Sequence, residues 1–165
     1  MKSEVERLVE LYERNRGEYA KRSSRYNESD TRADFVDPFF AALGWDVANT
    51  RGQSRRLREV VRETQVAGSE HTKRPDYEFK LGPERKFFVE VKKPGVDVAN
   101  SPAAAFQVRR YGWSADLAIS VVTNFEFLAI YDTTIEPQQV KSLPTGGSSC
   151  STTPNTAANW TRSRA

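Results

Sequence analysis

Residues 74–94 read RPDYEFKLGPERKFFVEVKKP, and this stretch decides the fold of the chain. Apolar and charged residues alternate on both sides of the turn signal LGPER, which predicts a β-hairpin. We expect a three-residue loop at 82–84, and this loop fixes the register of the two strands. The cross-strand pairs that follow are Lys80–Lys86, Glu78–Phe88 and Asp76–Glu90, the last with Cβ atoms roughly 5 Å apart.

The Asp76–Glu90 pair is hard to explain as structure alone, because two carboxylates so close repel each other. A divalent cation between them removes the repulsion, and Mg²⁺ favours one or two carboxylates together with waters and phosphate oxygens. Lys92 projects from the same strand face as Glu90. It could hold an attacking water, help to deprotonate it, or offset charge on the phosphorane. The three side chains therefore suit metal-assisted phosphodiester hydrolysis. The alternative is a solvated hairpin face with a cross-strand ion pair.

Composition narrows the chemistry further. A chain of 165 residues with 38% hydrophobic and 28% charged residues suits one soluble globular domain. The net charge of +3 permits a nucleic-acid partner without requiring one. Because the sequence has one cysteine, Cys150, and one histidine, His71, an internal disulfide, a cysteine-based zinc site and paired-histidine chemistry are excluded. No signal peptide or membrane-spanning run is evident, so a cytoplasmic location is expected.

The remaining elements predict an α/β fold with a mixed central β-sheet flanked by helices. Helices are expected at 3–15, 31–43 and 103–113. The second of them should be capped by Ser29 or Asp30 and bent or restarted at Pro38, and it should bury Phe35, Val36, Phe39, Phe40 and Leu43. Further strands are expected at 44–49, 59–63, 116–123 and 126–132. The segment 51–74 is a basic loop carrying the edge strand 59–63, and residues 144–165 form a low-complexity tail predicted to be disordered, which leaves 1–143 as the domain.

The order Pro-Asp, hairpin, Glu-x-Lys, seen here as PD…EVK, resembles the PD-(D/E)XK nuclease superfamily. FQVRRYGWS at 106–114 contains Gln107-x-x-x-Tyr111, which is similar to the QxxxY motif of one branch of that superfamily. NESDTRADFVDPFFAALGWDV at 27–47 and LAISVVTNFEFLAIYD at 117–132 resemble the opening helix and the later strand pair of one group in it. That group is the N-terminal nuclease domain of type I restriction subunits and fused restriction–modification enzymes. The resemblance covers about residues 25–133.

This resemblance implies a restriction-endonuclease-like fold and a Mg²⁺-dependent DNA endonuclease, with Mn²⁺ as a possible substitute. It implies methyltransferase, specificity or motor subunits as partners. It assigns site residues as follows: Asp76 and Glu90 as metal ligands, Lys92 as the catalytic lysine, Gln107 and Tyr111 as supporting residues, and Glu28 as a further acid at the metal. EFK at 78–80 lies too close to Asp76 to be the second motif strand. Bases of 51–74 and 109–110 would contact the DNA backbone.

Other readings remain open for the same residues. Glu28 suits a helix start, where the dipole favours acids. Gln107 and Tyr111 suit ordinary packing on the sheet, and 51–74 suits a solvated loop. For the whole chain, the alternatives are a catalytically inactive nuclease-fold module that binds DNA or assembles with partners, and an α/β domain unrelated to nucleic acid.

Overall fold

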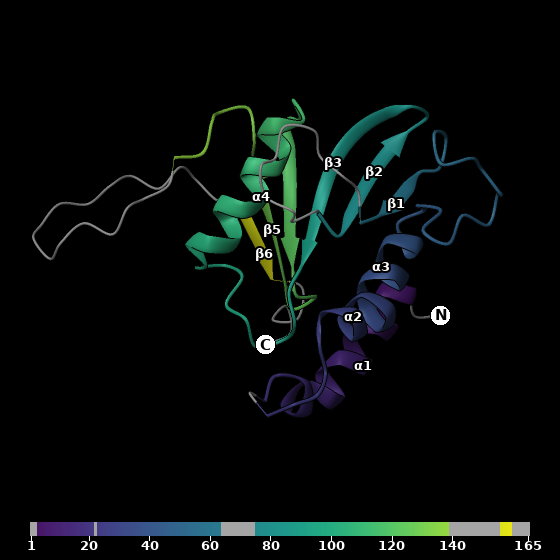
Figure 1. Ribbon diagram of the computed structural model, residues 1–165. Coiled ribbons are helices and arrows are strands. Elements are labelled where there is room, and N and C mark those ends of the chain that lie inside the picture. Colours follow the sequence, from purple (N-terminus) through teal and green to yellow (C-terminus); the bar gives the residue numbers. More distant parts are fainter. Residues whose placement is uncertain (1–2, 22, 64–74, 139–155, 160–165) are drawn as a thin grey trace, which may run out of the picture.

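The computed structural model describes residues 3–21, 23–63, 75–138 and 156–159. Its elements can be followed along the chain in Figure 1. They are α1 (Glu4–Tyr19), α2 (Glu28–Thr31), the π-helix η1 (Arg32–Val36), α3 (Asp37–Ala42), β1 (Val60–Arg62), β2 (Tyr77–Leu81), β3 (Glu84–Val91), α4 (Pro102–Ser114), β4 (Ile119–Thr123), β5 (Phe127–Asp132) and β6 (Thr156–Asn159).

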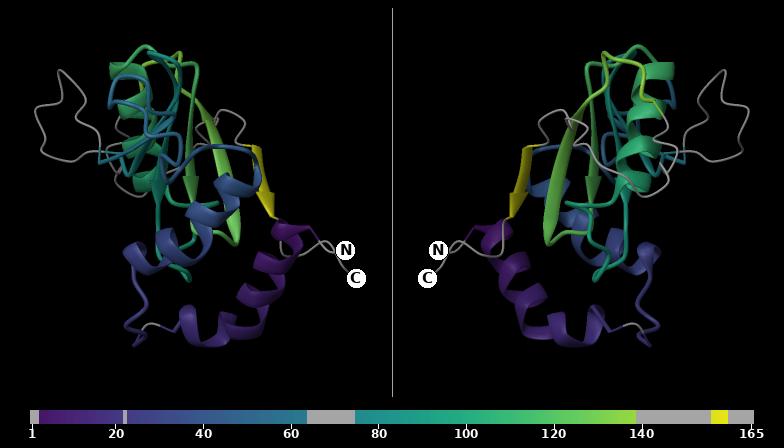
Figure 2. Two further views of the ribbon diagram at one scale, coloured as in Figure 1. Left: turned by 90° about the vertical axis from the view of Figure 1, so that its right-hand side faces the viewer. Right: turned by 90° about the vertical axis from the view of Figure 1, so that its left-hand side faces the viewer.

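The strands form one mixed sheet in the order β1-β2-β3-β4-β5-β6. β3 and β4 are parallel and α4 makes the crossover between them, whereas the other neighbouring strands are antiparallel. Helices lie on both faces of the sheet, with α4 on one side and α1 to α3 on the other (Figure 2). The predicted α/β class with a mixed central sheet flanked by helices is confirmed, and it is consistent with a restriction-endonuclease-like fold.

Strand alternation sends neighbouring residues of the hairpin into two different layers. Phe79 and Val89 are fully buried against the N-terminal helices in the main hydrophobic core, which also contains Tyr12 and Phe35. The opposite face carries Phe88, which packs with Tyr111 and Leu117 below α4. Because α4 contacts β3, β4 and β5, the sheet face bearing Glu78 and Glu90 is partly covered by this helix.

The hairpin register is confirmed near the predicted site and wrong near the turn. Glu78 pairs with Phe88 and Tyr77 with Val89, as expected, but Lys80 pairs with Arg85. The turn contains two residues, Gly82 and Pro83, where three were predicted, and a register shift follows Phe79 and leaves Lys86 as the extra residue. The shorter turn and the bulge offset each other, so the predicted register holds for Glu78–Phe88 and Tyr77–Val89, while the Asp76–Glu90 pair stays a prediction.

Local hydrogen bonds set where the N-terminal helices begin and where the π-helix is followed by an α-helix. α1 extends the predicted helix to Tyr19. The next helix starts at Glu28 because the Asn27 side chain accepts the N–H groups of Ser29 and Asp30, so the prediction of Ser29 or Asp30 as the N-cap is wrong. The restart predicted at Pro38 is confirmed, because η1 gives way to α3 at Asp37.

Two smaller predictions are wrong. Leu43 was expected to be buried by the second helix, but it is 56% exposed. It follows the last residue of α3, Ala42, and so does not belong to the buried helix face. Residues 44–49 form turns and not a strand. The Asp46 carboxylate accepts the N–H groups of Thr50 and Arg51 and so folds this segment back on itself.

Other predicted elements are present. β1 is the expected edge strand, and α4, β4 and β5 lie within two or three residues of their expected bounds. In the tail predicted to be disordered, Thr156–Asn159 pairs with β5 as β6, so the prediction does not hold for these four residues. They satisfy backbone groups of β5 that would otherwise form a sheet edge.

The rest of 144–165 lies outside the described residues, as do His71 and Cys150, and the domain boundary at 143 stays a prediction. Over the described part of the chain, no helix is long and apolar enough to cross a bilayer.

Candidate active site

Asp76 lies immediately before β2, where two donors hold its carboxylate. Oδ2 accepts the backbone N–H of Val91 at 2.7 Å, and Oδ1 accepts Nη1 of Arg32 at 2.9 Å. The side chain is largely buried. Burial raises the pKa of Asp76, and this effect outweighs the lowering by the Val91 N–H and the charge of Arg32. Asp76 is therefore a carboxylate held in one orientation between β3 and η1.

Glu90 is buried on β3, with two donors on one oxygen and none on the other. Oε1 accepts Nζ of Lys92 at 2.7 Å and Nε2 of Gln107 at 2.8 Å. Oε2 is buried and has no hydrogen-bond partner. Burial raises the pKa of Glu90, and the charge of Asp76 raises it further against the lowering effect of Lys92. Asp76 is thus close enough to act on Glu90 electrostatically.

Lys92 follows β3 and lies among acids. Its Nζ contacts Glu90, and Oε1 of Glu28 lies 3.8 Å away at the start of α2. Burial alone would lower the pKa of Lys92, but the hydrogen bond to Glu90 and the charges of Glu90, Glu28 and Asp76 raise it overall. Lys92 is therefore an ammonium group near neutral pH, with its charge directed at the two carboxylates.

Helix α4 supports Glu90 through Gln107 and Tyr111, which share a helix face at i,i+4 spacing. Nε2 of Gln107 lies 3.1 Å from the Tyr111 hydroxyl as well as near Glu90. Tyr111 is buried against Phe88, and burial raises its pKa. The structure therefore brings together all six predicted residues, while the roles assigned to them stay predictions.

Arg32 is a site residue that the sequence reasoning missed. It is the first residue of η1 and its guanidinium pairs with Asp76. One signal was present in the sequence, because Glu28 and Arg32 are four residues apart in a helix and so share a face. The Val91 N–H was also missed, since no sequence pattern assigns a side-chain acceptor to a particular backbone donor.

The donor set fits a hard divalent cation. Two carboxylates, of which Glu90 is buried and has one oxygen without a partner, are of the type of oxygen ligand that Mg²⁺ takes, with waters and phosphate oxygens filling its other positions. Among the described residues, no three His, Cys, Asp or Glu side chains are grouped to hold a metal. Glu28 contacts Lys92, and a ligand role for Glu28 stays a prediction.

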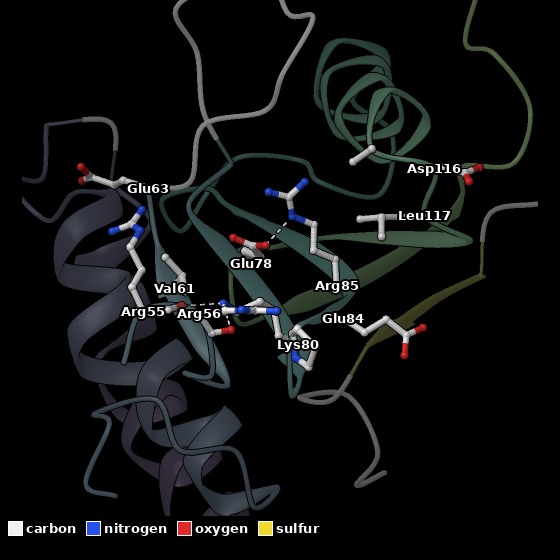
Figure 3. Close-up of a pocket in the computed structure, with 12 residues that line it drawn as sticks. Arg55, Arg56, Val61, Glu63, Glu78, Lys80, Glu84, Arg85, Asp116 and Leu117 are labelled. Atoms are coloured by element: carbon white, nitrogen blue, oxygen red, sulfur yellow. Dashed lines mark hydrogen bonds and ion pairs between the residues drawn. The ribbon is translucent and has the colours of Figure 1, made fainter. Parts of the chain in front are cut away.

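A polar pocket of about 930 Å³ lies along the hairpin on the same sheet face as Glu90. Figure 3 shows Glu78, Lys80 and Arg85 within it, with Arg55 at one side and Leu117 at the other. Arg85 pairs with the buried carboxylate of Glu78. Lys80 Nζ donates to the carbonyls of Arg55 and Arg56. The two charged side chains of the EFK segment, Glu78 and Lys80, are therefore engaged in this pocket and not with Asp76. Glu63, which lies near Arg32, also lines it.

Comparison with known proteins gives one informative relative. Over 144 residues, 86% of this chain, the sequence is 45% identical to the type II restriction enzyme and methyltransferase RM.Eco57I of Escherichia coli. The chain spans 14% of the length of that protein. No protein-family model and no solved structure matches the chain. The identity relates this chain to a restriction–modification enzyme.

Proposed function

We propose that the chain is a Mg²⁺-dependent DNA endonuclease domain of a restriction–modification system and belongs to the PD-(D/E)XK type. This proposal is carried by the half-buried Asp76 and the buried Glu90, whose Oε2 has no partner. Both pKa values are raised, so the ionised pair is unfavourable by itself, and a bound cation would offset that cost. Similarity to a restriction enzyme and methyltransferase supports the same class of reaction.

In this mechanism Asp76 and Glu90 would hold the cation, Mg²⁺ or in its place Mn²⁺. When bound there, it would supply Lewis-acid chemistry for phosphodiester hydrolysis. Nζ of Lys92 donates to Glu90 and lies near Glu28, so we assign Lys92 to positioning the water and offsetting developing negative charge. Gln107 fixes the Glu90 carboxylate, and Tyr111 braces Gln107.

We propose the pocket along the hairpin as the path of the DNA backbone. Arg55 and Arg56 line it with exposed side chains, while Lys80 fixes their backbone carbonyls. On α4, Arg109 Nε donates to the Asp132 carbonyl at the end of β5, which makes it a weaker candidate than the other two arginines. Phosphate contacts of this kind orient DNA without reading its sequence.

Base recognition would then come from another part of the system. The relative joins a restriction enzyme to a methyltransferase, and this chain spans 14% of its length. We therefore propose that methyltransferase, specificity or motor regions act together with the domain in the cytoplasm.

Lys92→Ala tests the catalytic assignment, with Lys86→Ala as the matched control. Both lysines are on or next to β3, but Lys86 pairs with Glu84 away from the acid pair. We expect Lys92→Ala to slow nicking of circular DNA by roughly 10²–10³-fold, the scale for loss of one transition-state donor. Lys86→Ala should cleave at the wild-type rate, and EDTA should stop both.

Two outcomes would count against the proposal. Cleavage by Lys92→Ala at the wild-type rate would remove Lys92 from the mechanism. Salt-dependent DNA binding by the wild type, without cleavage in Mg²⁺ or Mn²⁺, would favour the catalytically inactive DNA-binding module.

A further inference from the structure

Each acid of the pair is matched by one cationic side chain. Lys92 contacts Glu90, and Arg32 contacts Asp76 through Nη1 and Oδ1 at 2.9 Å. With the Val91 N–H on Oδ2, both oxygens of Asp76 are engaged by donors. A cation bound to Asp76 must therefore share or displace the contact with Arg32, since guanidinium and metal carry like charge.

Arg32 has a second acidic neighbour, Glu63, with which its guanidinium can pair. Oε1 of Glu63 lies 4.0 Å from the same Nη1, and the Glu63 side chain is 71% exposed. The Glu63 backbone N–H donates to the Asp76 carbonyl at 2.9 Å, which holds the two residues side by side. Glu63 also has a φ of 52°, a left-handed conformation that residues with a Cβ seldom adopt. Its position next to the site is thus held against a local backbone cost.

The backbone around Arg32 is unusual as well. Arg32 opens η1, in which the Asp37 N–H reaches back to the Arg32 carbonyl. Single π-turns of this kind are uncommon and occur often at functional sites. Here the turn leaves Phe35 and Val36 in the core while the Arg32 guanidinium lies on Asp76.

We propose that Arg32 competes with the divalent cation for Asp76 and transfers to Glu63 when the cation binds. Arg32 is then a positioning residue that keeps the acid pair compatible with folding and sets how tightly the metal is held. This inference rests on the proposed metal-dependent function. A purely structural ion pair between η1 and β2 would also stabilise the fold, but it would leave metal affinity unchanged.

The test measures metal binding without DNA, by calorimetric titration with Ca²⁺ or Mg²⁺ and by thermal unfolding in EDTA. Arg32→Gln should unfold at a lower temperature in EDTA yet bind the metal more tightly, by up to about fivefold, the scale of one solvent-accessible ion pair. Arg16→Gln is the matched control, because Arg16 pairs with the buried Glu126 away from the acid pair. It should lower the unfolding temperature and leave metal affinity unchanged.

Glu63→Gln gives a second measurement that does not depend on the folding of the Arg32 variant. Removing the alternative partner of Arg32 should weaken metal binding by several-fold, with little change of unfolding temperature in EDTA, since the Glu63 carboxylate is exposed. Unchanged metal affinity in Glu63→Gln would overturn the transfer of Arg32.

The outcomes separate this inference from the function on which it rests. If the wild type binds metal and Asp76→Asn does not, equal affinity in the wild type and Arg32→Gln overturns the role of Arg32 alone. If the wild type binds no divalent cation, the metal-dependent function and the role of Arg32 both fall.

Discussion

Glu90 shows how a single buried charge can serve chemistry at the expense of stability. It is 5% exposed and its pKa is raised above the ordinary value of 4.5, even with Lys92 and Gln107 on Oε1. A carboxyl with a raised folded-state pKa contributes stability below its unfolded pKa. That contribution is lost as the pH rises through the folded value. At pH 8 Glu90 therefore destabilises the fold.

Glu90→Gln should raise the unfolding temperature in EDTA at pH 8 by a few degrees and abolish Mg²⁺-dependent cleavage. The gain in temperature should shrink as the pH falls through the raised pKa, because the wild-type carboxyl then becomes neutral too. Thermal unfolding across pH measures this difference. Glu18→Gln, an exposed site on α1 away from the pocket, serves as the control and should change neither property. A lower unfolding temperature for Glu90→Gln at pH 8 would contradict the burial argument.

At the scale of elements, α4 holds its place on the sheet through a close approach at Gly112. A Cβ added there would lie 2.5 Å from Ser120 Oγ and 2.6 Å from the Thr133 side chain. Glycine at this position lets the helix backbone approach β4 and the end of β5. Gln107 and Tyr111 lie on the same helix, so this packing also sets their distance from Glu90.

Gly112→Ala should therefore destabilise the protein by about 1–3 kcal/mol, the usual cost of overpacking. Gly17→Ala, in the exposed part of α1 where an added Cβ meets nothing within 4 Å, should instead stabilise by up to about 1 kcal/mol. Urea unfolding of the two variants gives the comparison. Equal stabilities would mean that α4 shifts freely on the sheet.

At the scale of the whole molecule, the sheet separates two surfaces. The face toward α1 to α3 is filled by the aromatic core, whereas the face toward α4 carries Glu90 and the polar pocket. Figures 1 and 2 show α1 and α4 on opposite sides of the sheet. DNA that reaches Asp76 and Glu90 should therefore meet Arg55 and Arg56 before it meets the arginines of α1.

The double variant Arg55→Ala and Arg56→Ala should weaken DNA binding and lower the slope of log K against log salt by about 2. Lys80 binds the backbone carbonyls of both residues, so truncating their side chains keeps the loop anchored. Arg7→Ala with Arg14→Ala on α1 removes the same charge from the other surface and should not change the slope. DNA affinity measured over a series of salt concentrations tests this prediction. Equal slopes for the two double variants would contradict the proposed path of the DNA along the hairpin pocket.

Short-range patterns in the sequence determined much of this protein. Strand alternation and the turn signal predicted the hairpin with its pairs Glu78–Phe88 and Tyr77–Val89, and i,i+4 spacing put Gln107 and Tyr111 on one helix face. These features depend on residues close in sequence or on one fixed period.

The partners that surround the acids come from distant parts of the chain. Arg32 reaches Asp76 across 44 residues and Gln107 reaches Glu90 across 17. The buried Oε2 of Glu90, the π-turn before Pro38 and the left-handed Glu63 likewise have no local signature. Whether a charged side chain is solvated or buried depends on which elements pack over it. The sequence therefore predicted the two acids, whereas their environment and their partners Arg32 and Gln107 come from helices packed on both faces of the sheet.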